Sequence, residues 1–177
     1  MTRAEVLNKL DCAIAAKNPT LLRYLRPGLM TNAIERRLKG VSGLTEPLFD
    51  LYSWHDGTDF VHLGPGETFV QGMEKITIIP GARFHFVRLE LAASYMQVWD
   101  EAARKRPNIK QMVGRYFTLF YDGADEYIML DLDPSKKGRV IHYTNESHIP
   151  FRKVYETIDE LLHDILHATE NGIFLKM

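Results

Sequence analysis

The chain has 177 residues, of which 45% are hydrophobic and 25% charged, as in an ordinary globular domain. A net charge of −1 argues against a protein built as a whole for a polyanionic partner, and the single cysteine, Cys12, excludes an internal disulfide. No apolar run approaches the roughly 20 residues that span a bilayer, and residues 1–6 contain no apolar signal core. We therefore expect one domain over residues 1–177 in a reducing, cytoplasmic setting.

The first third of the chain predicts helices. Thr2 and Glu5 have the spacing of a capping box, and apolar residues follow them at helical intervals. Thr45 is placed to cap a later helix, which should stop before Gly57, because glycine readily adopts the left-handed conformation of a helix end. The expected helices cover about residues 2–18, 19–26, 32–40 and 45–54.

Irregular structure and two longer helices are expected further along the chain. Residues 75–86 are apolar but interrupted by a Pro-Gly pair, which is typical of an edge strand or irregular segment. A long helix is predicted over residues 89–105 and should be stopped by Pro107. Thr157 is expected to cap a final helix over residues 158–169. The inward-facing residues of the long helix are Ala92, Tyr95, Met96, Trp99 and Ala103.

Three consecutive segments rich in β-branched and aromatic residues predict antiparallel strands. They cover residues 115–121, 126–132 and 138–143. Asp122 and Gly123 suit a tight reversal between the first two, and Pro134 ends the second because it has no amide hydrogen for a ladder. We expect the middle strand to lie at the centre of one mixed, mostly antiparallel sheet with helices packed against it, an α+β fold.

Two histidines one helical turn apart, His163 and His167, resemble a zinc-binding helix with Asp164 between them. The helical phase turns both away from the apolar face, and no third ligand is spaced for a metal. Surface histidines are the favoured interpretation, and we predict no metal site and no cofactor. A basic group formed by residues 104–106, Lys110 and Arg115 is best explained by cations near a helix C-terminus, so no nucleic-acid partner is expected.

A group of five carboxylates surrounds the predicted middle strand. Paired carboxylates can serve acid–base chemistry or hold a divalent cation. The calcium-loop pattern fails, however, because Lys136 stands where glycine is needed and His142 where glutamate is needed. Turn-forming and solvated side chains are favoured, and we predict no catalytic residue. The group consists of Asp122, Asp125, Glu126, Asp131 and Asp133.

Three landmarks in this order resemble the SUKH superfamily, the Smi/Knr-type domain first named for a fungal cell-wall assembly regulator. Residues 46–57 are similar to the family's Leu-Pro helix followed by a Trp-x-Asn-Gly turn, with Glu46 and Asp56 as departures. Residues 122–134 form the second landmark. The third comprises Gly138, Val140 and residues 155–162, similar to the family's closing helix.

The resemblance implies an α+β domain that binds another protein and catalyses nothing. Bacterial members often act as immunity proteins, which bind and block a cognate toxin of the nuclease or deaminase class. Partner-binding residues are expected on loops and on an open sheet face: the five carboxylates, which would meet a basic toxin, and then Trp54, His55 and Asp56. Two alternatives stay open, a regulatory or scaffold module of the cell-wall assembly regulator type and a metal-dependent enzyme.

Overall fold

The structure, a computed structural model, describes residues 1–43, 45–59, 66, 68–105, 110, 113–144 and 151–175. The expected helix stop at Pro107 lies outside the described residues, as does Arg106 of the predicted basic group. The helices are α1 (Arg3–Lys17), α2 (Pro19–Tyr24), α3 (Thr31–Arg37), α4 (Glu46–Trp54), α5 (Phe69–Ile76), α6 (Leu89–Lys105), α7 (Ile158–Asn171) and the short 3-10 helix η2 (Pro134–Lys136). The strands are β1 (Leu25–Pro27), β2 (His55–Thr58), β3 (His85–Phe86), β4 (Tyr116–Tyr121), β5 (Glu126–Asp131), β6 (Val140–Thr144) and β7 (Phe151–Tyr155).

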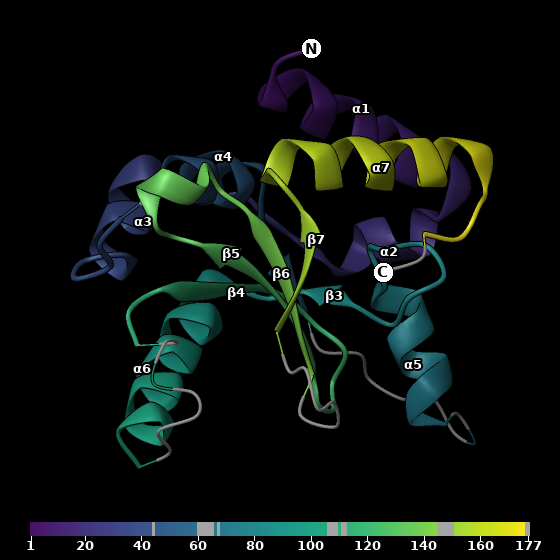
Figure 1. Ribbon diagram of the computed structural model, residues 1–177. Helices are drawn as coiled ribbons and strands as arrows, with labels where there is room; N and C mark the ends of the chain where they lie inside the picture. The colour runs from purple at the N-terminus through teal and green to yellow at the C-terminus, as the bar shows by residue number, and fades with distance from the viewer. Residues whose placement is uncertain are drawn as a thin grey trace.

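The large sheet has the order β3-β4-β5-β6-β7, so the predicted middle strand does lie at its centre. The α+β class with helices packed on a sheet is confirmed (Figure 1). The expectation of one mixed sheet needs correction, because β1 and β2 form a second, two-stranded sheet, and every pairing among the described strands is antiparallel. Short connections such as that from β4 to β5 allow only antiparallel neighbours.

The two faces of the large sheet carry different cores. Along β5, Ile128 and Leu130 point into a mainly aliphatic core shared with α1, α4 and α7. Met129 points to the other face, where a smaller core forms with Ala103 of α6 and is rich in tyrosine. The ring of Trp99 in α6 lies edge-on to the rings of Tyr127 and Tyr143, with a distance of 5.2 Å between ring centroids in each pair. The predicted inward stripe of α6 is therefore confirmed.

Helix α1 packs along α7, so the first and last described helices lie side by side (Figure 1). The predicted capping box at Thr2 and Glu5 is present at the start of α1. Arg3, at the start of α1, forms ion pairs with both α7 and α4. Its guanidinium lies 2.6 Å from the carboxylate of Asp159 at the start of α7. It also lies 2.6 Å from the carboxylate of Asp50 and 3.1 Å from that of Glu46, both in α4. This largely buried arginine fixes the direction in which α1 and α7 run together.

Three local expectations differ from the structure. Helix α4 passes directly into β2, and Gly57 has its positive φ of 73° inside that strand rather than at a helix end. A Cβ on Gly57 would lie 2.5 Å from the backbone nitrogen of Arg88, so glycine is required there. Helix α2 ends at Tyr24 because the next residues form β1, and α5 was not predicted at all. Within the described part of the chain, no helix has the length and apolar character that crossing a membrane requires.

Candidate docking face

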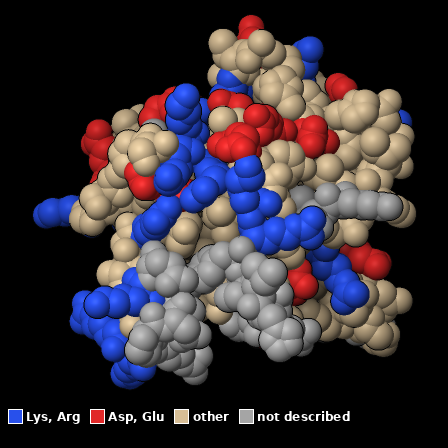
Figure 2. Space-filling view, in the orientation of Figure 1, with Lys and Arg blue, Asp and Glu red and all other residues tan. Residues whose placement is uncertain are grey.

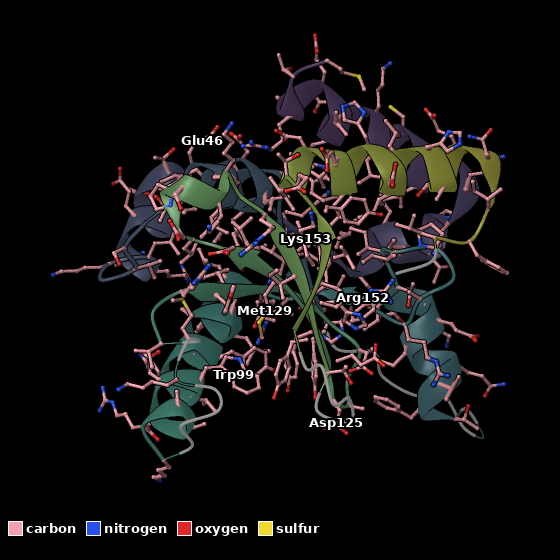
Figure 3. The ribbon with its side chains drawn as sticks, in the orientation of Figure 1. Glu46, Trp99, Asp125, Met129, Arg152 and Lys153 are labelled. Atoms are coloured by element: carbon pink, nitrogen blue, oxygen red, sulfur yellow. The ribbon has the colours of Figure 1, made fainter. Side chains whose placement is uncertain are left out.

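The predicted acidic group does not form one surface, because its members divide between the two ends of β5. At the β4–β5 turn, Oδ1 of Asp122 accepts the backbone N–H groups of Ala124 at 2.8 Å and of Glu126 at 3.0 Å. Glu126 Oε2 lies 2.9 Å from Nε2 of His142 on the neighbouring strand. Asp125 is exposed near the tip of this turn (Figure 3). This end therefore consists of a turn former, a cross-strand partner and one exposed acid.

At the other end of β5, Asp131 is fully buried. Arg115 holds it with two hydrogen bonds of 3.0 Å, Nη2 of Arg139 donates a third at 2.9 Å, and the backbone N–H of Asp133 donates a fourth at 3.1 Å. Burial opposes ionisation, but the hydrogen bonds from Arg115, Arg139 and Asp133 outweigh it and lower the pKa of Asp131. The expectation that Asp131 meets a partner is corrected, since its carboxylate is enclosed by its own chain.

The second predicted group, Trp54, His55 and Asp56, also makes internal contacts. Asp56 is buried, and its Oδ1 accepts the backbone N–H of Leu89 at 3.0 Å, which satisfies a donor at the start of α6. Nδ1 of His55 lies 2.7 Å from the carbonyl oxygen of Arg26. Trp54 stacks on a core aromatic ring and packs against the main core. Buried Asp56 in particular is a helix cap rather than a docking residue.

The histidines of α7 lie on the surface, as their helical phase predicts. His163 and His167 are both exposed, while their neighbours Leu162 and Leu166 are buried. Among the described residues, no group of three or more histidine, cysteine, aspartate or glutamate side chains is placed to hold a metal ion. Nδ1 of His167 lies 3.0 Å from the side-chain amide nitrogen of Asn171.

Lysine and arginine side chains gather on one side of the molecule, over the β5–β6 connection and the edge strand β7 (Figure 2). We call this set the cationic face. Arg152 and Lys153 lie on β7 in the middle of the view in Figure 3. The side chains of Arg115 and Arg139 are 31% and 25% exposed, and the other four residues are exposed. The cationic face consists of Arg115, Lys136, Lys137, Arg139, Arg152 and Lys153.

Three carboxylates pair with three of these cations, Arg115, Arg139 and Lys153. Asp131 joins Arg115 to Arg139, and Asp133 lies 3.9 Å from Nη2 of Arg115. Glu156 pairs with Lys153, and the hydrogen bond and charge of Lys153, with a smaller contribution from Arg139, lower the pKa of Glu156. Six cations against three carboxylates leave an excess of three positive charges. The arginines are held in place by Asp131, so part of the face is rigid before any partner arrives.

The backbone next to η2 is unusual at Lys137. Lys137 has φ 52° and ψ 32°, which is the left-handed conformation. All other described residues with a positive φ are glycines. The conformation costs a non-glycine residue on the order of 1–2 kcal/mol. Asp133 secures the turn by accepting the backbone N–H of Ser135 at 2.9 Å. The connection therefore holds two adjacent lysines in a defined, strained position.

A separate pocket of about 480 Å³ lies between the ends of α1 and α7 and the segment around Pro80. Ile14, Leu21 and Ile78 contribute to a mostly apolar lining. Two of its polar side chains are already engaged, since Thr169 donates to the carbonyl of Ile165 and Asn18 accepts from a backbone N–H. The lining also includes the charged residues Lys17, Glu74 and Arg83, so the pocket is apolar only in part.

Comparison with known protein families found no family that matches this chain, and comparison with curated proteins found no match. The resemblance to the SUKH superfamily stays a prediction. The cationic face was not predicted from the sequence. A signal was present in adjacent Arg152-Lys153 and Lys136-Lys137 pairs, but nothing in their sequence separation shows that they meet. Only the pairing of β6 with β5 and β7 brings them together.

Proposed function

We propose that this chain is a non-catalytic binding protein that acts in the cytoplasm as an immunity protein and neutralises a cognate bacterial toxin of the nuclease or deaminase class. The observation that carries the proposal is the cationic face, in which Asp131 holds Arg115 and Arg139 in place. Charge complementarity accelerates docking and selects partners, and fixed side chains reduce the entropy lost on association. The SUKH resemblance of residues 46–57 and 122–134 points to the same class of function.

The internal roles of the predicted site residues also support binding over chemistry. Asp131 is neutralised by two arginines, and Asp56 caps α6, so both carboxylates contribute to the stability of the scaffold. The groups left at the surface of the cationic face are cations on long side chains. Such a surface is suited to contacting a second protein across an area rather than to reacting with a substrate in a cleft.

The test is co-expression with the product of a gene adjacent to the one for this chain, where that product is toxic to the host cell. We expect growth to be restored in cells that express the toxin, and the two purified proteins to form a stable complex by size-exclusion chromatography and calorimetry. A matched strain expresses a destabilised variant, Gly57→Leu, which should give no protection. Continued toxicity in the presence of well-folded wild-type chain would refute the proposal, as would substrate turnover by the purified chain alone.

A further inference from the structure

We infer that the partner presents an acidic protein surface to the cationic face, with the lysines of the β5–β6 connection, Lys136 and Lys137, as its principal contacts. This inference rests on the proposed function, because it names the chemistry of the partner at that site. It reverses the charge expected from the sequence, where the carboxylates around β5 were to meet a basic toxin. Two of those carboxylates, Asp131 and Asp133, instead lie among the cations and hold Arg115.

The first argument is convergence from distant parts of the chain. Arg115 precedes β4, Lys136 and Lys137 lie between β5 and β6, and Lys153 is on β7. Mutual repulsion among six cations opposes this arrangement, and three carboxylates compensate for only part of it. The excess of positive charge is therefore not needed to hold the fold together. An acidic surface brought onto the face would relieve that repulsion.

The second argument is the strained position of a cation. The left-handed conformation of Lys137 is one that glycine, or to a lesser degree asparagine, adopts with less strain. A lysine there gives up stability and places a charge beside that of Lys136. Strain of this kind is concentrated at active sites, ligand clamps and switch regions, and a contact position for a partner belongs with these. This observation is independent of the count of charges.

A simpler explanation accounts for part of the face. β7 is an edge strand of the large sheet, and charged residues such as Arg152 and Lys153 discourage edge strands from pairing with other chains. That explanation does not reach Lys136 and Lys137, which lie in the turn around η2 and not on the edge. The whole face is thus larger than protection of β7 requires.

The surroundings favour an acidic protein over a nucleic acid. A band of carboxylates borders the cations on the same side of the molecule (Figure 2). Exposed carboxylates on this side include Glu46, which lies at the start of α4 (Figure 3). A nucleic acid carries negative charge along its whole length and would be repelled by this band. A protein surface with an acidic patch of limited size can cover the cations and leave the band free.

The first test uses the isolated chain and fluorescein-labelled decaglutamate as the probe, followed by fluorescence anisotropy at 50 mM and 300 mM NaCl. We expect binding that weakens at high salt and falls at least tenfold in the triple variant Lys136→Gln/Lys137→Gln/Lys153→Gln. The matched control, Lys9→Gln/Lys17→Gln/Arg23→Gln on α1 and α2, removes the same charge from exposed positions. It should change affinity less than twofold.

Two results with the isolated chain would overturn the inference. An equal loss in the control variant would mean that decaglutamate responds to net charge alone. Tighter binding of a ten-base-pair DNA duplex than of decaglutamate, at the same ionic strength, would assign the face to nucleic acid. Circular dichroism melts of both triple variants would confirm that they remain folded, so a lost interaction is a surface effect.

The second test separates the inference from the proposed function. With the adjacent-gene toxin, we expect the charge reversal Lys136→Glu/Lys137→Glu to slow complex formation at least tenfold and to reduce protection of growth. Full protection by this variant would overturn the inference and leave the immunity function standing. Failure of wild-type chain to protect would overturn the function, and the decaglutamate measurement would then still decide whether the face selects acidic protein surfaces.

Discussion

The two ends of β5 use carboxylates in opposite ways. At the β4–β5 turn, Asp122 accepts backbone N–H groups in a partly exposed position, so its bonds compete with water. At the other end, Asp131 is fully buried and every hydrogen bond it accepts comes from its own chain, two of its partners being charged. From the sequence alone, Asp122 and Asp131 were predicted to belong to one acidic group. Their difference shows that burial, rather than charge, decides whether a carboxylate belongs to a surface.

Removal of the buried acid should have the largest effect. In Asp131→Ala, Arg115 and Arg139 lose the acceptor that compensates them, and we expect unfolding free energy to fall by about 3 kcal/mol. Both arginines are partly exposed, so water will limit the loss. Urea denaturation measures the change. The exposed acid in Asp125→Asn serves as control, with a change within about 0.5 kcal/mol. Equal stability of the two variants would contradict the contrast between the ends.

The same contrast predicts a pH dependence. The folded state lowers the pKa of Asp131 below its ordinary value of 3.8, because the hydrogen bonds from the two arginines outweigh burial. Its stabilising contribution is therefore complete above that ordinary value and is lost as the pH falls through the lower, folded-state pKa. The stability difference between wild type and Asp131→Asn should shrink as the pH falls from about 5 to below the ordinary value of 3.8. A difference that stays constant over that range would disprove the assignment.

Asp122 should have a smaller effect. Asp122→Ala removes the acceptor for two backbone N–H groups in the β4–β5 turn, which water can partly replace, and we expect a loss of about 1 kcal/mol. Asp122→Asn keeps an acceptor oxygen and should remain near wild type in the same urea titration. If both substitutions destabilise equally, the charge of Asp122 matters more than its turn geometry.

The smallest expected effect is a gain at the connection after the buried end. Lys137→Gly relieves the left-handed strain but increases the freedom of the unfolded chain, so we expect a net gain of about 0.5 kcal/mol. Lys136→Gly, in η2, has no strain to relieve and should lose about 0.5–1 kcal/mol. Thermal melts of the pair measure the opposite signs. A loss in both variants would show that Lys137 is not strained.

The elements that sequence patterns predicted well are those with a long local signal. Alternation and turn residues located β4, β5 and β6, and the capping residues Thr2 and Thr157 located α1 and α7. Two kinds of element were missed. β1 and β2 are short and pair only with each other across α3 and α4, which no local pattern reveals. α5 had a usable signal, the capping box of Thr68 and Gln71, which the surrounding glycines obscured.

The candidate site was harder to predict because it depends on tertiary placement. Asp131 and Asp125 are both acids of one hairpin, but only the sheet register places Arg139 and Arg115 around the first. Asp56 looked available in a turn motif, whereas the start of α6 lies against it. Surface and interior cannot be separated for such residues until the pairing of distant strands is known.

The packing of α1 on α7 also bears on how the protein is made. The apolar residues Leu7, Leu10 and Ile14 of α1 are buried in the folded protein, in the core that α7 shares. During translation α1 leaves the ribosome early, and α7 follows only after the strands β1 to β7 of the described chain have emerged. Contacts between such remote segments slow folding. Until they form, apolar surface stays exposed to chaperones and to aggregation. Completion of this fold therefore waits until residues 158–171 have left the ribosome.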